Sequence, residues 1–313
     1  SDEKINNYPK YFLEEKKSIE KLIELAFVNK DISRNVSKKV KSNSVKCNIS
    51  KKKFKEIVLR AKKYIKNGDI FQVVLSQRFE SKLTKTPLEI YKKLRITNPS
   101  PFMFFFNFKD FQIIGSSPEI LVRLRNNKIT IRPIAGTRPR GRDAKKDNFY
   151  KNQLLNDKKE LSEHLMLLDL GRNDVGKVSK INTVKVTESF KIEKYSHVMH
   201  IVSNVEGKFD KKNSLLDTML AGFPAGTVTG APKIRSMEII DELEKTKRKM
   251  YAGSIGYFSA NKSFDTCIAL RTALIKDNKF YIQSGAGIVA DSIPEKEYLE
   301  TVNKAKALID SLN

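Results

Sequence analysis

Residues suited to disulfide or transition-metal chemistry are scarce in this 313-residue chain, which contains two cysteines and three histidines. Cys47 and Cys267 show no metal-binding spacing, so a reduced setting fits best. No apolar run approaches the ~18 residues that span a bilayer. The charged start SDEKINNYPKYF does not resemble a secretory signal, and the lack of an initial Met indicates a fragment or a processed chain. We therefore expect a cytoplasmic protein with no membrane partner.

Acidic residues are also few relative to basic ones. The chain has 36 Asp and Glu and 60 Lys and Arg, which gives a formal net charge of +24. Such a charge can indicate nucleic-acid binding. Lys, densest in residues 38–66, supplies most of the excess, whereas Arg, which reads bases better, is rarer. Zinc-finger spacing, an RNP-like aromatic pattern and an obvious helix-turn-helix are all missing. We favour solvated lysine-rich surfaces and no nucleic acid as partner, and keep a basic nucleic-acid-binding protein as the alternative class.

The order of the predicted elements favours an α+β fold. Residues 1–50 form a polar segment, with an amphipathic helix over 11–26 and a linker over 31–48. Residues 51–313 form one domain without a further break. Strands are predicted over residues 70–79, 102–108, 111–115, 120–125, 128–134, 184–192, 198–206, 252–260, 264–276 and 279–283. Helices are predicted from Ser50 to Gly68 and over residues 144–175, 215–222, 231–243 and 295–312. Strands and helices come in runs rather than in alternation, which argues against a doubly wound sheet.

Two Glu-x-x-Glu pairs carry the clearest chemical signal in the sequence. Glu160 and Glu163 form one pair, and Glu297 and Glu300 form the other. An i, i+3 spacing places both carboxylates of a pair on one face of a helix. The second pair follows the run 285–287, Gly-Ala-Gly, whose backbone N–H groups could bind an anion. The pairs therefore indicate either a Mg²⁺ site beside a carboxylate pocket or two solvated acidic faces.

Longer segments resemble the chorismate-utilising enzymes, and most of all the anthranilate synthase component I branch of that family. The segments are GDIFQVVLSQRF, GSSPEILVR, IRPIAGTRPRG, ELSEHLMLLDLGRND, FPAGTVTGAPKIRSMEII, YAGSIGYFS, DTCIALRTALI and QSGAGIVADSIPEKEYLETVNKA. They occur in order over about residues 50–313. The resemblance implies a layered chorismate-binding fold with two large antiparallel sheets flanked by helices. It also implies a carbon–oxygen lyase that converts chorismate and ammonia to anthranilate and pyruvate in tryptophan biosynthesis.

The resemblance assigns residues to a pocket for the two carboxylates of chorismate. Arg271 matches the arginine that grips the enolpyruvyl carboxylate, to which its fork can bond twice. Tyr251 and the amides of Gly285, Ala286 and Gly287 complete that clamp. Thr137, Gly136 and Ala135 match further substrate-binding positions in the IAGT segment.

The resemblance also assigns the metal and the acid. Glu163 and Glu300 match the Mg²⁺ ligands, Glu160 and Glu297 match the acidic residues behind them, and Lys304 matches a lysine near the metal and substrate. Lys304 could equally form an ordinary surface pair with Glu300. Glu119 matches the general acid for the ring hydroxyl, a role that suits a buried carboxyl with a raised pKa. His200 and Thr227 match groups near the departing hydroxyl, whereas we expect His164 and His197 to be structural.

Two positions distinguish the branches of the family. Members that add water to the ring carry a lysine, as general base, where this chain has Gln72. Aminodeoxychorismate synthases typically carry a nucleophilic lysine where this chain has Ala135. Free ammonia needs neither lysine, so the resemblance favours anthranilate formation, with aminodeoxychorismate synthase as the alternative.

A partner and a regulator are the last expectations. Neither cysteine lies in a nucleophile-elbow segment, so we expect a separate glutamine amidotransferase subunit, component II, to supply the ammonia. The family's tryptophan site uses a Leu-Leu-Glu-Ser segment that this sequence lacks. Its remaining contacts resemble Pro101, Met103, Tyr257 and Cys267, with Phe102 where Tyr is common.

Overall fold

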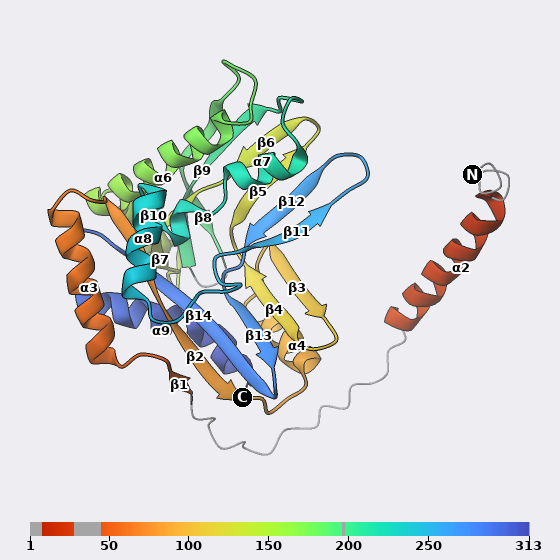
Figure 1. The fold of residues 1–313 in the computed structure, drawn as a ribbon, viewed down its shortest axis with the longest axis horizontal. Coiled ribbons are helices and arrows are strands. Elements are labelled where there is room, and N and C mark those ends of the chain that lie inside the picture. The colour runs from red at the N-terminus through yellow and green to blue at the C-terminus, as the bar shows by residue number, and fades with distance from the viewer. Residues whose placement is uncertain (1–7, 28–44, 196–197, 313) are drawn as a thin grey trace. The chain divides into compact units, whose positions relative to one another are not determined.

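The computed structural model describes residues 8–27, 45–195 and 198–312 (Figure 1). The chain divides into two compact units, residues 1–41 and 42–313. The first contains α2 (Tyr8–Phe27), which confirms the amphipathic helix predicted there. Most of the predicted linker lies outside the described residues, but Lys46–Cys47 form the short strand β1, which belongs to the second unit and pairs with β2 (Gln72–Lys82). Within the described ranges, no helix is long and apolar enough to cross a membrane.

The second unit has the predicted α+β architecture, with two seven-stranded sheets. Sheet A has the order β1-β2-β14-β13-β4-β3, with β10 also paired to β2, and every pairing is antiparallel. Its further strands are β2 (Gln72–Lys82), β3 (Phe102–Asn107), β4 (Gln112–Ser117), β10 (Gly230–Ala231), β13 (Thr272–Lys276) and β14 (Lys279–Ile288). The longest ladder of this sheet joins β14 to β2 and places Gly285 opposite Ser76 and Gly287 opposite Val74.

Sheet B has the order β11-β12-β5-β6-β9-β7, with β8 also paired to β9, and is antiparallel as well. Its strands are β5 (Ile120–Arg125), β6 (Lys128–Ile131), β7 (Ile134–Pro139), β8 (Lys185–Lys194), β9 (Val198–Lys208), β11 (Ser254–Phe258) and β12 (Phe264–Ile268). Asn126 and Asn127 connect β5 and β6 with φ of 51° and 57°, as expected for the predicted two-residue hairpin turn.

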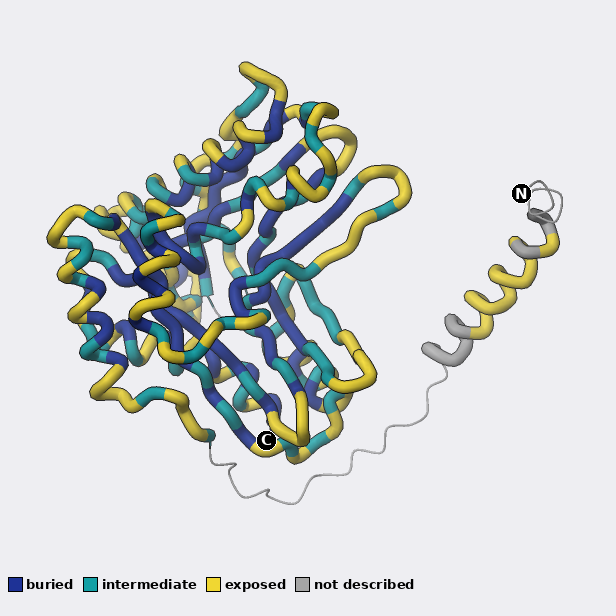
Figure 2. Tube along the Cα trace, viewed as in Figure 1, coloured by how far each residue is buried: buried dark blue, intermediate teal, exposed yellow. Residues whose placement is uncertain are grey.

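Helices pack on the sheets through apolar faces that the sequence periodicity predicts. On α3 (Lys51–Lys66), Phe54, Ile57, Val58 and Ala61 are buried in a cluster that includes Leu75 and Ala286 of sheet A. Its N-cap Ser50 accepts a hydrogen bond from the Lys53 amide, as predicted. The remaining helical elements are α4 (Pro87–Thr97), α5 (Ala144–Leu155), α6 (Lys158–Gly176), α7 (Leu215–Ala221), η1 (Gly226–Val228), α8 (Lys233–Leu243) and α9 (Pro294–Leu312). Figure 2 shows the buried residues running along the strands, with exposed residues on outer helix faces.

Two predictions of elements were wrong, and one helix was missed. The predicted strand 264–276 is two strands in different sheets, because the chain leaves β12 and enters β13 through Ala269–Arg271. The predicted strand 128–134 ends at Ile131, and a separate strand, β7, follows Pro133, which has no backbone N–H for a ladder. The helix α4 was missed, although Thr86 and Glu89 form a capping box and Pro87 occupies its first turn.

Candidate active site

The two pairs of glutamates lie on two helices that approach the end of the β2–β14 ladder. Glu160 and Glu163 lie on α6, and Glu297 and Glu300 lie on α9. Glu163 Oε1 accepts a hydrogen bond of 2.8 Å from Gln72 Nε2 at the start of β2. A Cβ on Gly287 would come within 2.5 Å of Gln72 Nε2 and 3.5 Å of Glu163 Oε1. Gln72, Glu163 and Gly287 therefore meet at one point.

Like charges crowd at this point. Burial, with the nearby Glu160 and Glu300 carboxylates, raises the pKa of Glu163 above its ordinary value. Burial also raises the pKa of Glu297, with a further contribution from Glu300, although Ser292 opposes it. Carboxylates held together in this way favour a hard cation, and Mg²⁺ prefers oxygen ligands. The donor set therefore fits Mg²⁺, although among the described residues no three acidic, His or Cys side chains form a ready metal cluster.

Lys304 belongs to the same site. Its Nζ lies 2.7 Å from Glu300 Oε1 and donates a 3.0 Å hydrogen bond to the Gly285 carbonyl on β14. Burial alone would lower the pKa of Lys304, but Glu300 and other anionic groups more than offset it, so the pKa is raised. The side chain is nevertheless 48% exposed. Because Lys304 also bonds the Gly285 carbonyl on β14, it does more than form an ion pair with Glu300 along the surface of α9.

Glu119 lies in the link between β4 and β5 and is 6% exposed. Burial raises its pKa to about 8, while Thr227, Lys304 and Arg271 partly oppose the rise. Thr227 lies on η1, and its buried hydroxyl faces the Glu119 carboxyl. Both residues line a cavity of about 30 Å³. Glu119 is therefore protonated at neutral pH, as a general acid must be.

His200 on β9 faces the β-bulge of β7. The register of these strands shifts between Ala135 and Thr137, where Gly136 has φ of 69°. As a result His200 Nδ1 lies 3.0 Å from both Thr137 Oγ1 and the Gly136 carbonyl. Burial lowers the pKa of His200, with smaller contributions from Arg271 and Lys304, so the imidazole is neutral. The carbonyl contact indicates that Nδ1 carries the proton.

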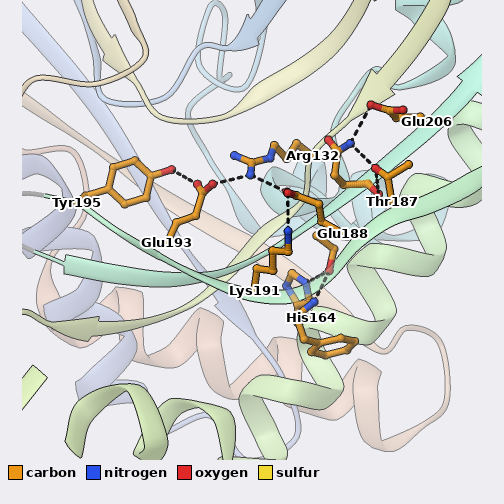
Figure 3. A network of polar contacts seen from close by, with 11 residues as sticks. Arg132, His164, Thr187, Glu188, Lys191, Glu193, Tyr195 and Glu206 are labelled. Atoms are coloured by element: carbon orange, nitrogen blue, oxygen red, sulfur yellow. Dashed lines mark hydrogen bonds and ion pairs between the residues drawn. The ribbon is translucent and has the colours of Figure 1, made fainter. Parts of the chain in front are cut away.

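Polar contacts beyond His200 hold Tyr195 in place (Figure 3). The Tyr195 ring meets His200 edge-on at 5.5 Å, and its hydroxyl donates a 2.9 Å hydrogen bond to Glu193. Arg132 then bridges Glu193 and Glu188. The sequence reading missed Tyr195, although it lies only five residues before His200. His164 lies outside the site as predicted, buried with Nε2 2.6 Å from Ser203 Oγ, and His197 falls outside the described residues.

Arg271 occupies the break between β12 and β13 with φ of 46°, a conformation that costs energy for a non-glycine residue. The prediction of Arg271 within a strand was therefore wrong, because the chain changes sheets there. Burial lowers the pKa of Arg271, while Tyr195 and Glu119 nearby oppose the change. Since Arg271 and Lys304 both affect the pKa of Glu119 and that of His200, these four groups lie near one another.

The Tyr251 hydroxyl packs closely against Gly285, since a Cβ at that position would lie only 2.8 Å from the hydroxyl oxygen. Arg248, which the sequence reading missed, fixes this region. Its guanidinium bonds Glu244 and the carbonyls of Val228 and Val74, and its charge lies 5.4 Å from the Tyr251 ring centre. The pairing of β13 with β14 ends at Ile282, whereas the pairing of β14 with β2 continues to Ile288. In the run 285–287, any backbone amide that points away from β2 therefore has no partner on β13. Tyr251, Gly285 and Lys304 thus form one edge of the site.

The four predicted regulatory residues do not line one common cavity. Pro101 and Phe102 line a cavity of about 350 Å³ with Arg123, Arg132 and Tyr195. Met103 lies on β3, while Tyr257 on β11 accepts a hydrogen bond from Arg125 and is 55% exposed. Cys267 is buried on β12. A regulatory role for these residues stays a prediction.

Comparisons with known proteins agree with this geometry. The sequence matches the family described as chorismate binding enzyme over residues 3–310. Anthranilate synthase component 1 of Cereibacter sphaeroides is 61% identical over 264 residues, which are 84% of this chain and 53% of that protein. The relative from Aquifex aeolicus is 54% identical over 85% of this chain and 54% of its own length. The chain thus spans about half the length of these curated relatives.

A solved structure shares the fold. The crystal structure of anthranilate synthase component I from Streptococcus pneumoniae superposes with a TM-score of 0.83 at 43% identity, over 94% of this chain and 65% of that chain. The agreement confirms the predicted α+β fold with two antiparallel sheets.

Proposed function

Because this chain belongs to the chorismate binding enzyme family, we propose that it converts chorismate and ammonia to anthranilate and pyruvate, the first committed step of tryptophan biosynthesis. Water is the third product, since the C4 hydroxyl leaves. The relatives named anthranilate synthase component 1, at 54–61% identity, support this proposal.

The observation that carries the proposal is the bond between Gln72 and Glu163. An amide at this point cannot deprotonate water at neutral pH, and it is fixed by the 2.8 Å bond to Glu163. Ala135 on β7 supplies no amine that could add to the ring in its own right. Ammonia is already a nucleophile in its free-base form. The site therefore has no general base at position 72 to activate water and no lysine amine at position 135 to attack the ring. Attack by ammonia at C2 of chorismate requires neither group.

The residues of the chain divide the chemistry among themselves. Glu119, neutral at pH 7 because burial raises its pKa to about 8, donates a proton to the departing C4 hydroxyl. Neutral His200, held by Gly136 and Thr137, orients that hydroxyl. Arg271 grips the enolpyruvyl carboxylate with its fork. Loss of pyruvate then restores the aromatic ring.

Mg²⁺ is the proposed cofactor, and Glu163 and Glu300 would hold it, with Glu160 and Glu297 behind them. When bound, the metal would neutralise the ring carboxylate of chorismate and fix its orientation. Lys304 stays charged beside Glu300 and adds a second positive group for the anionic substrate.

A glutamine amidotransferase subunit is the proposed source of ammonia. The name component 1 of the relatives supports a second component. Cys267 is buried, and burial raises the pKa of its thiol to about 11, so it is not a glutaminase nucleophile. A cytoplasmic location stays a prediction.

An assay with added ammonium salt tests the function without the partner. Chorismate, Mg²⁺ and ammonium at alkaline pH should give anthranilate fluorescence and pyruvate in equal amounts. Glu300→Ala should abolish Mg²⁺-dependent turnover while leaving the thermal unfolding cooperative. If folded wild-type chain releases no anthranilate when free ammonia is plentiful, the proposal fails. Formation of 4-amino-4-deoxychorismate instead would support the alternative enzyme.

A further inference from the structure

Arg138 links the substrate strand β7 to the N-terminus of α6. Its Nη2 donates a 2.7 Å hydrogen bond to Asp157, the N-cap of α6, and its Nε donates a 3.1 Å bond to Gln153. Its Nη1 donates to Glu160 Oε1 at 3.1 Å and to the Thr137 carbonyl at 2.9 Å. The side chain is 18% exposed, and each of its three nitrogens has an acceptor. Such a guanidinium is fixed in position rather than mobile on the surface.

This arrangement leaves Glu160 less free than Glu163. One oxygen of Glu160 bonds Arg138, and the other faces Gly136, where a Cβ would lie 3.2 Å away. Glu163, in contrast, bonds only the neutral amide of Gln72, which a cation can join without losing a charge pair. A direct bond from Glu160 Oε1 to a metal would require it to leave a guanidinium that cannot lose its proton.

The charges of the site point the same way. Asp157 and the four glutamates Glu160, Glu163, Glu297 and Glu300, when ionised, carry a formal charge of −5. Arg138 contacts Asp157 and Glu160, and Lys304 contacts Glu300, so these two cations reduce the charge to −3. One Mg²⁺ then brings it to −1 before the dianionic substrate arrives. Without Arg138 the same site would be more negative by one charge and would repel chorismate more strongly.

We propose that Arg138 is a positioning residue that keeps Glu160 from binding Mg²⁺ directly and balances its charge. This inference rests on the proposed function, because it assigns a role relative to that metal. With Glu160 held back, two protein carboxylates bind the ion, and coordination positions stay available for water and the ring carboxylate.

Calorimetric titration of the whole chain with Mg²⁺ alone tests the inference apart from turnover. Arg138→Met should bind Mg²⁺ about tenfold more tightly, because a positive charge is removed beside a dication and Glu160 is released. Arg138→Lys keeps the charge and should stay within about twofold of wild type. Arg140→Met is the matched control, since Arg140 lies two residues along the chain and pairs with Asp147 and the Tyr195 carbonyl. Its Mg²⁺ affinity should not rise.

The outcomes separate the alternatives. A purely structural role would loosen α6, so Arg138→Met would bind Mg²⁺ more weakly, and this result, or an unchanged affinity, would overturn the inference while leaving the proposed function intact. If Arg138→Met is too unstable to titrate, Arg138→Gln with the same readout decides. If the wild-type chain binds no Mg²⁺, the proposed metal site and the inference both fail.

Discussion

At the scale of single residues, the environment of each side chain decides its role. Glu119 and Glu163 are both buried glutamates. Glu119 has Lys304 and Arg271 nearby and still has a pKa of about 8, because burial dominates. Glu163 has other carboxylates nearby, and these add to the effect of burial on its pKa. One residue type thus provides an acid in one place and a candidate metal ligand in another.

Glu119→Gln should lower kcat by roughly 10²–10⁴-fold, the usual range for loss of a general acid. The wild-type rate should fall as the pH rises through about 8, since only the protonated carboxyl donates. Because folding raises this pKa, the wild-type chain should also lose stability as the pH rises from ~4.3 towards the folded value. Glu119→Gln should not show that loss. A pH series of turnover and urea unfolding measures both, and identical profiles for the two proteins would contradict the assignment.

The sequence predicted most of these residues but few of their partners. Gln72, Glu163 and Glu119 stand in long matched segments, so their positions could be assigned in advance. Arg138 and Arg248 stand in or beside such segments too. Their roles depend on which groups lie near them in the fold, and neither spacing nor charge pattern shows that.

At the scale of elements, the break between β12 and β13 was the feature least visible in the sequence. Eight of the 13 residues 264–276 are apolar and no Gly or Pro interrupts them, so the pattern is typical of one strand. The chain nevertheless changes sheets at Ala269–Arg271, with Arg271 in a left-handed conformation. The change of sheets places Arg271 among groups from both sheets.

Arg271→Ala and Arg271→Gly should each weaken kcat/KM for chorismate by ~2–4 kcal/mol, the scale for loss of one member of a buried charge pair. The glycine variant should be more stable than the alanine variant by about 1 kcal/mol, because glycine accepts a positive φ without strain. Steady-state kinetics and urea unfolding measure the two effects. Normal kinetics would argue against the clamp, and an alanine variant as stable as the glycine variant would argue against strain.

The end of β14 needs glycine for a different reason. Gly287→Ala would place a methyl group 2.5 Å from Gln72 Nε2 and displace the amide from Glu163. We expect kcat to fall at least tenfold, since an ångström-scale shift of positioned groups can cost about 10²-fold. Gly176→Ala, at the end of α6 with no atom within 4 Å of the new Cβ, should keep wild-type activity. Equal activity of both variants would show that the close packing at Gly287 is not required.

At the scale of the whole molecule, the class of fold could be predicted and the strand order could not. Runs of strands and helices indicated α+β, but the order β2-β14-β13-β4 joins segments far apart in the sequence. That order brings the start of β2 beside the end of β14, with α6 and α9 adjoining. The glutamate cluster forms because these four elements meet.

The product formed from chorismate and ¹⁵N-ammonium tests the central claim most directly. With Mg²⁺ and the folded chain, mass spectrometry and NMR should show ¹⁵N-anthranilate together with an equal amount of pyruvate. An amino product that keeps its enolpyruvyl group, or isochorismate without nitrogen, would contradict the account.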